Sequence, residues 1–161
     1  MESCRRATPD DVGEIVRLAT ALRAELGSMR GGVLWLAREA RPEPLDAAYR
    51  ELLGRDDALL VIGTIDDSAV GFGAVEIETL RTGERLAVIA ALFVEAEARS
   101  VGVGEAMAGT LIEFCVTQRC VGIDTQALPG HRATKNFFEE QGFTARSLIM
   151  HRSLRAEDAD A

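Results

Sequence analysis

The sequence predicts a mixed α/β domain of the α+β kind, with a central mixed sheet that contains an antiparallel meander and carries flanking helices. Three observations predict this class. The chain has 161 residues, the length of one ordinary domain. Hydrophobic residues make up 47% and charged residues 27%, which is enough apolar material for a full core. The middle of the chain carries strand-like runs joined by short turns, the pattern of a meander rather than of a doubly wound sheet.

Helices are expected to open the chain. Residues 8–27 begin with threonine, proline and two aspartates, which suit a helix start, and then carry apolar residues at helical spacing. A second helical stretch over residues 34–54 is interrupted by Pro42 and Pro44, because proline removes a backbone donor and clashes with the preceding turn.

The sequence of the remaining residues predicts the meander, followed by alternating helices and strands. Apolar, β-branched runs separated by Asp-, Ser- and Gly-containing turns indicate strands, and a periodic apolar face indicates each helix. Strands are expected at residues 58–65, 69–80, 86–94, 121–125 and 143–154, and helices at 103–114 and 132–141. One domain over residues 1–154 is expected, with a disordered acidic tail over residues 155–161.

Composition excludes several classes of function. Eighteen basic residues against 26 acidic ones give a net charge of −8, which disfavours a nucleic-acid partner. No apolar run approaches the ~20 residues that span a bilayer, so no membrane partner is expected. The N-terminal residues do not resemble a secretory signal, so the three cysteines are expected to be reduced thiols in the cytoplasm. Neither histidine lies near a cysteine in sequence, so no metal site is expected.

The segment Arg99-x-x-Gly102-x-Gly104 carries the clearest chemistry. It follows an expected strand and opens an expected helix, so glycines and unpaired helix-start N–H groups would form an anion site for a phosphate-bearing ligand. A plain glycine-rich surface loop is the alternative interpretation. A dinucleotide fingerprint, and with it an oxidoreductase, is disfavoured because Met107 stands where a glycine or alanine is needed.

Two segments resemble the GNAT acyltransferase superfamily. The strand ending at Val94, with the loop and the Arg-x-x-Gly-x-Gly motif that follow, is similar to the acyl-CoA signature of that family. Residues 137–143, Phe-Phe-Glu-Glu-Gln-Gly-Phe, resemble the family's segment before its last strands. The order of elements over residues 3–154 is also similar.

This resemblance implies acetyl-CoA as co-substrate and no metal. The pyrophosphate would bind the backbone N–H groups of the loop, the pantetheine arm would pair with the strand edge, and the Val94 N–H would polarise the thioester carbonyl. The residues implied in coenzyme binding are Phe93, Val94, Arg99, Ser100, Val101, Gly102, Val103, Gly104, Asn136 and Phe138. The acetyl group would pass directly to an amine, without a covalent enzyme intermediate.

The sequence does not decide which groups act as general acid and general base. The family's frequent tyrosine acid corresponds to Phe138, which has no hydroxyl, so solvent or His131 would protonate the thiolate. Glu76 and Glu78 share one face of a strand and could relay a proton or hold a cation, or could simply form a solvated face.

The implied acceptor is a primary amine on a small molecule or peptide, and the net negative charge favours a cationic one. The missing tyrosine motivates an alternative, an acyl-CoA-binding sensor or interaction module without turnover. A homodimer is common in the family.

Overall fold

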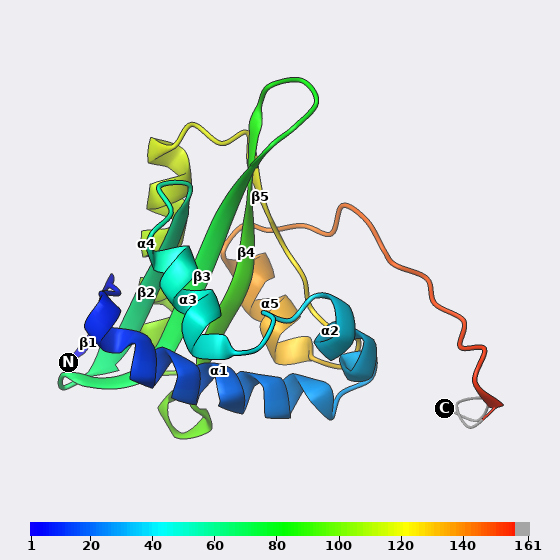
Figure 1. Cartoon of the computed structure of the whole chain (residues 1–161), viewed down its shortest axis with the longest axis horizontal. Coiled ribbons are helices and arrows are strands. Elements are labelled where there is room, and N and C mark those ends of the chain that lie inside the picture. Colours follow the sequence, from blue (N-terminus) through cyan, green and yellow to red (C-terminus); the bar gives the residue numbers. More distant parts are fainter. Residues whose placement is uncertain (157–161) are drawn as a thin grey trace.

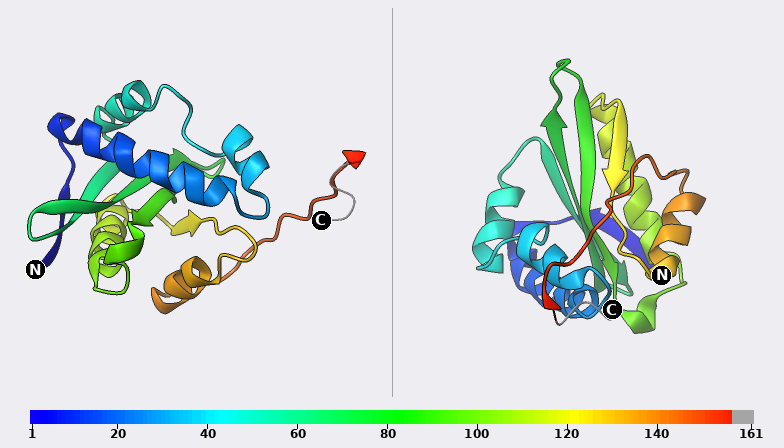
Figure 2. Two further views of the ribbon diagram at one scale, coloured as in Figure 1. Left: turned by 90° about the horizontal axis from the view of Figure 1, so that it is seen from below. Right: turned by 90° about the vertical axis from the view of Figure 1, so that its right-hand side faces the viewer.

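A single sheet separates two groups of helices in the computed structural model, which describes residues 1–156 (Figure 1). Three helices cover one face of the sheet and two lie on the other (Figure 2). The first group is α1 (Val12–Gly27), α2 (Gly32–Arg38) and α3 (Leu45–Leu53); the second is α4 (Val103–Thr117) and α5 (Arg132–Glu140). Short 3-10 turns, η1 (Pro9–Asp11) and η2 (Ala96–Ala98), precede α1 and α4.

The sheet has the strand order β1-β2-β3-β4-β5. Neighbouring strands are antiparallel from β1 to β4, and β5 is parallel to β4. This arrangement confirms the predicted mixed α/β class and its antiparallel meander. The strands are β1 (Glu2–Arg6), β2 (Ala58–Ile65), β3 (Ser68–Thr79), β4 (Arg85–Val94) and β5 (Gly122–Thr125).

The observed strands differ from the sequence prediction near both ends of the chain. The expected final strand over residues 143–154 is wrong, because this segment is extended but has no ladder partner and runs away from the sheet (Figure 1). The chain instead begins with β1, which the sequence did not predict and which pairs with β2. Of the predicted acidic tail over residues 155–161, residues 157–161 lie outside the described part of the chain.

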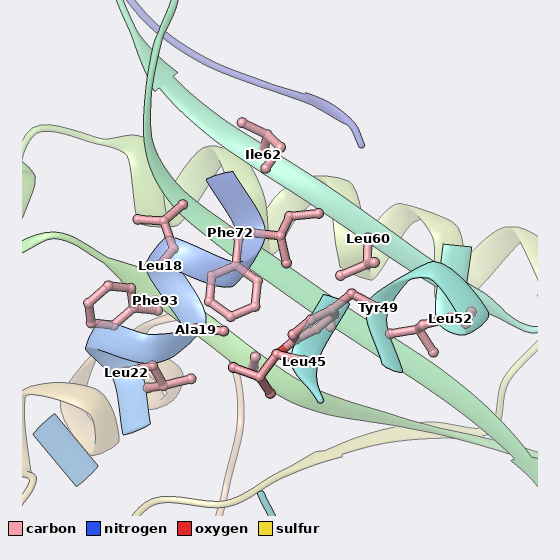
Figure 3. Close-up of a cluster of buried hydrophobic side chains, with 14 residues drawn as sticks. Leu18, Ala19, Leu22, Leu45, Tyr49, Leu52, Leu60, Ile62, Phe72 and Phe93 are labelled. Atoms are coloured by element: carbon pink, nitrogen blue, oxygen red, sulfur yellow. The ribbon is translucent and has the colours of Figure 1, made fainter. Parts of the chain in front are cut away.

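Each face of the sheet has its own apolar core. On the α1–α3 side the core centres on the fully buried Phe72 of β3, and Tyr49 of α3 meets its ring edge-on at 5.9 Å (Figure 3). On the other side Met107 and Leu111 of α4 are fully buried against the sheet.

The first turn of α4 lies very close to β2. A side-chain carbon on Gly63 would stand 2.5 Å from Val103 Cγ1 and 2.9 Å from the Met107 sulfur. Only glycine leaves room for this approach, so Gly63 fixes the height of the α4 N-terminus above the sheet.

Candidate functional site

Strands β4 and β5 separate part-way along their length. They pair from Leu86 opposite Gly122 to Ile89 opposite Thr125, and β4 then continues alone to Val94. The change of register between β3 and β4 leaves Ala90 unpaired, which marks a β-bulge at the point of separation. One edge of β4 beyond the bulge is therefore open.

The open edge presents backbone donors. The Glu95 N–H donates to the Val70 carbonyl at 2.8 Å, so alternation along the antiparallel ladder turns the Phe93 amide toward β3 as well. The amides of Leu92 and Val94 then point to the opposite, open edge. An extended ligand can add to this edge as a further strand, and the Val94 N–H can donate to a carbonyl lying there.

The glycine loop follows directly after this edge. Ser100 and Gly102 have positive φ values, 67° and 97°, and they turn the chain into α4. The first bond of the helix runs from the Ala106 N–H to the Gly102 carbonyl, at 3.1 Å. The N–H groups of the first turn of α4 therefore have no acceptor within the helix, and together with the helix dipole they are suited to bind an anion.

The Arg99 side chain supports the loop. Its Nε donates to the Val94 carbonyl at 2.9 Å, a terminal nitrogen donates to Glu25 of α1 at 2.8 Å, and the guanidinium lies 5.7 Å from the centre of the Phe93 ring. These three contacts join the loop to β4 and to α1. Arg99 is therefore placed to hold the loop in shape, and its N–H donates to the Ala96 carbonyl at 3.4 Å.

A cavity of about 210 Å³ lies on the α1–α3 side of the bulge. Its floor includes Ala90 of β4, and its walls include Trp35 and Tyr49 from the helices and Glu76 from β3. The cavity thus lies beside the separation of β4 and β5. Burial raises the pKa of Tyr49, and the nearby Arg41 opposes this shift, so the hydroxyl stays protonated at neutral pH.

Glu76 has two arginine partners, of which Arg41 also lines the cavity. Arg41 donates to one carboxylate oxygen at 2.6 Å and Arg55 to the other at 2.7 Å. Burial opposes ionisation, but the hydrogen bonds and charges of these two arginines outweigh it and hold the pKa of Glu76 below its usual value. Both oxygens are engaged, so the carboxylate is poorly suited to accept a proton.

The other predicted proton carriers lie elsewhere. Glu78 occupies the same face of β3 as Glu76, as alternation predicts, but it is exposed toward the end of the strand. His131 precedes α5, and its Nδ1 lies 3.0 Å from the Thr134 hydroxyl.

Helix α5 brings aromatic residues, rather than a hydroxyl, to the predicted site. Phe138 is buried, with its ring edge-on to Phe137 at 5.4 Å and to Phe143 at 5.2 Å. Phe137 in turn lies 3.4 Å from the point where a side chain on Gly104 would begin. Asn136 is exposed. Phe138 thus acts as core, and it is Phe137 that borders the glycine loop.

The pattern of the Acetyltransferase (GNAT) family matches residues 28–143, well over half of the chain. The chain belongs to this family. The matched range contains the β4 edge, the glycine loop and most of the cavity residues. This GNAT protein is an acyltransferase. None of the curated proteins matches the sequence closely enough to add a relative.

Solved structures agree with the GNAT fold. A tetramutant of the BH1408 protein from Bacillus halodurans has a TM-score of 0.79 at 17% identity, over 94% of this chain and 99% of that one. Glucosamine-6-phosphate N-acetyltransferase from Arabidopsis thaliana has a TM-score of 0.70 at 18% identity, over 96% of this chain and 99% of that one. An aminoglycoside acetyltransferase from an uncultured soil metagenomic sample, in complex with sisomicin, has a TM-score of 0.70 at 15% identity, over 96% of this chain and 95% of that one.

The arginines of this GNAT protein are the part of the site that sequence reasoning missed. Arg41 and Arg55 lie 35 and 21 residues from Glu76, in the connections around α3, and no spacing in the sequence links them to it. Tyr49 both packs in the core and lines the cavity. Across residues 1–156, no group of three or more His, Cys, Asp or Glu side chains is arranged to hold a metal ion, and no helix has the length and apolarity to cross a bilayer.

Proposed function

We propose that this GNAT protein transfers an acetyl group from acetyl-CoA directly to a primary amine of a small molecule or peptide. The observation that carries the proposal is the continuity of the open β4 edge with the glycine loop. A ligand with an extended amide-containing arm and a pyrophosphate fits that order, with the arm along Leu92 and Val94 and the phosphates at the start of α4.

The Val94 amide is the proposed electrophilic group. Acetyl-CoA supplies an activated thioester, and a backbone N–H aimed at its carbonyl oxygen would stabilise the negative charge that develops during attack. One such donor contributes about 3 kcal/mol to the transition state in acyl-transfer sites. The remaining acceleration comes from holding the amine and the thioester carbon together.

The acceptor amine is proposed to enter through the cavity between α1–α3 and the bulge at Ala90. Two of the structural neighbours are named for small-molecule acceptors, glucosamine-6-phosphate and aminoglycosides. The net charge of −8 favours a cationic acceptor through long-range attraction. The cavity wall itself offers both guanidinium and carboxylate groups.

Water is the proposed proton acceptor for the amine. The ammonium form of the acceptor has a pKa near 10, so it must lose a proton before the nitrogen can attack. Glu76, held as a carboxylate by Arg41 and Arg55, would keep the cavity wall in place rather than take this proton. The leaving thiolate takes its proton from water or from His131. The three free cysteines fit the reducing cytoplasm, where we place the reaction.

Two measurements on the purified protein test this function. Calorimetric titration should give micromolar binding of acetyl-CoA, with NADH as the control that does not bind. An amine panel with a thiol-release readout should then identify acceptors. Binding of acetyl-CoA without release of thiol for any amine would favour the alternative, an acyl-CoA-binding module without turnover. In that alternative, Phe138 at the family's tyrosine position leaves the protein without its general acid. Preferential binding of NADH would contradict both.

A further inference from the structure

Helix α4 ends in a backbone motif that brings two cysteines together. After the helix C-cap at Gln118, Arg119 has φ 58°, the left-handed conformation in which many helices stop. The Arg119 N–H donates to the Val116 carbonyl at 3.0 Å, and the Cys120 N–H donates to the Cys115 carbonyl at 3.1 Å. These two bonds define a Schellman motif, in which the side chains at the positions of Cys115 and Cys120 commonly meet.

The two thiols are near neighbours, and only one of them is open to solvent. Cys115 is 1% exposed in the core under α4, whereas Cys120 is half-buried at the edge of that core. Burial, with smaller contributions from the charge and the side-chain hydrogen bond of the Cys120 thiol, raises the pKa of Cys115 to about 11. A disulfide needs its β-carbons about 3.5–4.5 Å apart, a separation that side chains in contact provide.

The chain around Cys120 is held from both sides by the first residue of β4. The Arg85 guanidinium donates to the Gln118 carbonyl at 3.2 Å, and the Arg85 carbonyl accepts from the Val121 N–H at 2.8 Å. The backbone of Cys120 lies between these two contacts. It therefore cannot move away from Cys115 without breaking them, and the two side chains stay together.

We propose that Cys115 and Cys120 are a reversible oxidation site for a hydroperoxide, and that they form an intrachain disulfide at the end of α4. In the first step the Cys120 sulfur attacks a peroxide oxygen, an S–O bond forms, the O–O bond breaks, and one water leaves. In the second step the Cys115 sulfur attacks the Cys120 sulfur, the S–O bond breaks, and a second water leaves with the Cys115 proton. The two thiols lose two electrons, and one hydrogen peroxide becomes two waters. A thiol reductant reverses the bond, so in a reducing compartment it is transient.

The third cysteine lies outside this pair. Cys4 is in β1, where its thiol contacts the Thr110 hydroxyl of α4. Thr110 precedes Cys115 by five residues, which is about 7.5 Å along the helix axis. Cys4 is therefore expected to remain a thiol when the other two react.

The oxidation site is also separate from the proposed coenzyme site. Helix α4 has 15 residues and spans about 22 Å, with the glycine loop at its start and the two cysteines at its end. The disulfide would tie the end of α4 to the chain that enters β5 and would leave the glycine loop unchanged. The proposal therefore stands independently of acetyl transfer.

Trypsin separates the two cysteines, so the bond can be observed directly by mass spectrometry. Cleavage after Arg119 places Cys115 in residues 100–119 and Cys120 in residues 120–132, while Cys4 falls in residues 1–5. The full chain is reduced, treated with hydrogen peroxide, and alkylated in urea before digestion. We expect residues 100–119 joined to residues 120–132, with a mass two hydrogens below their sum, and Cys4 alkylated. Reduction of the digest should release the two peptides.

Cys4→Ser is the matched control and should give the joined peptides in the same yield. Cys120→Ser should give none and should leave Cys115 as a thiol. Alkylation of both Cys115 and Cys120 in the peroxide-treated full chain would overturn the proposal. So would a link that includes Cys4, or a sulfinic acid at Cys120 beside an unreacted Cys115.

Amide hydrogen exchange tests whether the bond closes on the existing helix end. The N–H groups of residues 118–121 are each hydrogen-bonded to a main-chain carbonyl. Because the disulfide restrains their opening, we expect exchange at these four positions to slow by at least about threefold on oxidation. Peroxide-treated Cys120→Ser should show no change. Unchanged or faster exchange in the linked protein would contradict the proposed geometry.

Discussion

The ion pairs of Glu76 fix the charge state of one carboxylate in the cavity wall. A half-buried carboxylate is stable only with partners, because burial without them would raise its pKa and favour the neutral acid. Arg41 and Arg55 supply those partners and link the connections on both sides of α3 to β3. Glu76 is therefore a structural tie between these connections and β3, and the two guanidinium groups balance its negative charge.

Replacing this carboxylate should weaken the fold in a pH-dependent way. Glu76→Gln is expected to lower the free energy of unfolding by about 2 kcal/mol at neutral pH, because the amide oxygen can accept from only one of the two arginines and carries no charge to assist that bond. A lowered native-state pKa gives stability above the unfolded-state pKa that is lost as the pH falls through the native value. The difference between wild type and variant should therefore shrink in acid, as measured by urea denaturation at several pH values.

Glu78→Gln on the same strand face is the control, since that side chain is exposed. Its effect should stay within about 0.5 kcal/mol. Equal losses in the two variants would contradict the special position of Glu76.

Introducing a tyrosine at position 138 should not supply a general acid for the reaction. Phe138 is 6% exposed between two rings, so a hydroxyl added there by Phe138→Tyr has little access to water and costs about 1–3 kcal/mol. Thermal denaturation should show the loss, and thiol release should show no gain in turnover. Phe137→Tyr, at the half-buried neighbour, should be milder. A large gain in turnover at position 138 with unchanged stability would show that the site lacks an acid that this position can supply.

At the scale of elements, the position of α4 depends on its close approach to β2. Gly63→Ala places a carbon against the buried Val103, whose branched side chain cannot move aside. We expect a loss of about 1–3 kcal/mol in the free energy of unfolding, measured in urea. We also expect weaker acetyl-CoA binding, because the start of α4 must shift.

Gly109→Ala, on the exposed side of the same helix, is the matched control. No neighbouring atom lies within 4 Å of an added carbon there, and alanine should stabilise the helix by about 0.5–1 kcal/mol. If Gly63→Ala proved as stable as wild type, close packing would not set the position of α4.

The elements that were predicted and those that were missed differ in where their stabilisation comes from. Strands β2–β4 and helices α1 and α4 bury their own apolar pattern, so the pattern was visible in sequence. Strand β1 is Glu-Ser-Cys-Arg-Arg, with only Cys4 partly buried, and it depends on its ladder with β2. Residues 143–154 show the converse, since they have a strand pattern but pair with no strand within residues 1–156.

At the scale of the whole molecule, the site combines one local motif with distant segments. The glycine loop could be predicted because its residues are contiguous and their backbone chemistry is local. The cavity could not, because its walls come from the helical region near Trp35 and Tyr49 and its floor from β3 and β4. Only the folded sheet, with its separation after Ile89, brings these parts together.

The central claim, that the loop before α4 binds the pyrophosphate of acetyl-CoA, is tested most directly by a matched pair of variants at Ser100. This residue has φ 67°, a conformation that both Asp and Asn adopt readily, so Ser100→Asp and Ser100→Asn differ mainly in charge. Calorimetric titration with acetyl-CoA should show binding at least about tenfold weaker for the Asp variant, because its carboxylate repels the phosphates. The Asn variant should bind nearly as tightly as wild type. Equal affinities in the two variants, or no binding by the folded wild-type protein, would contradict the account.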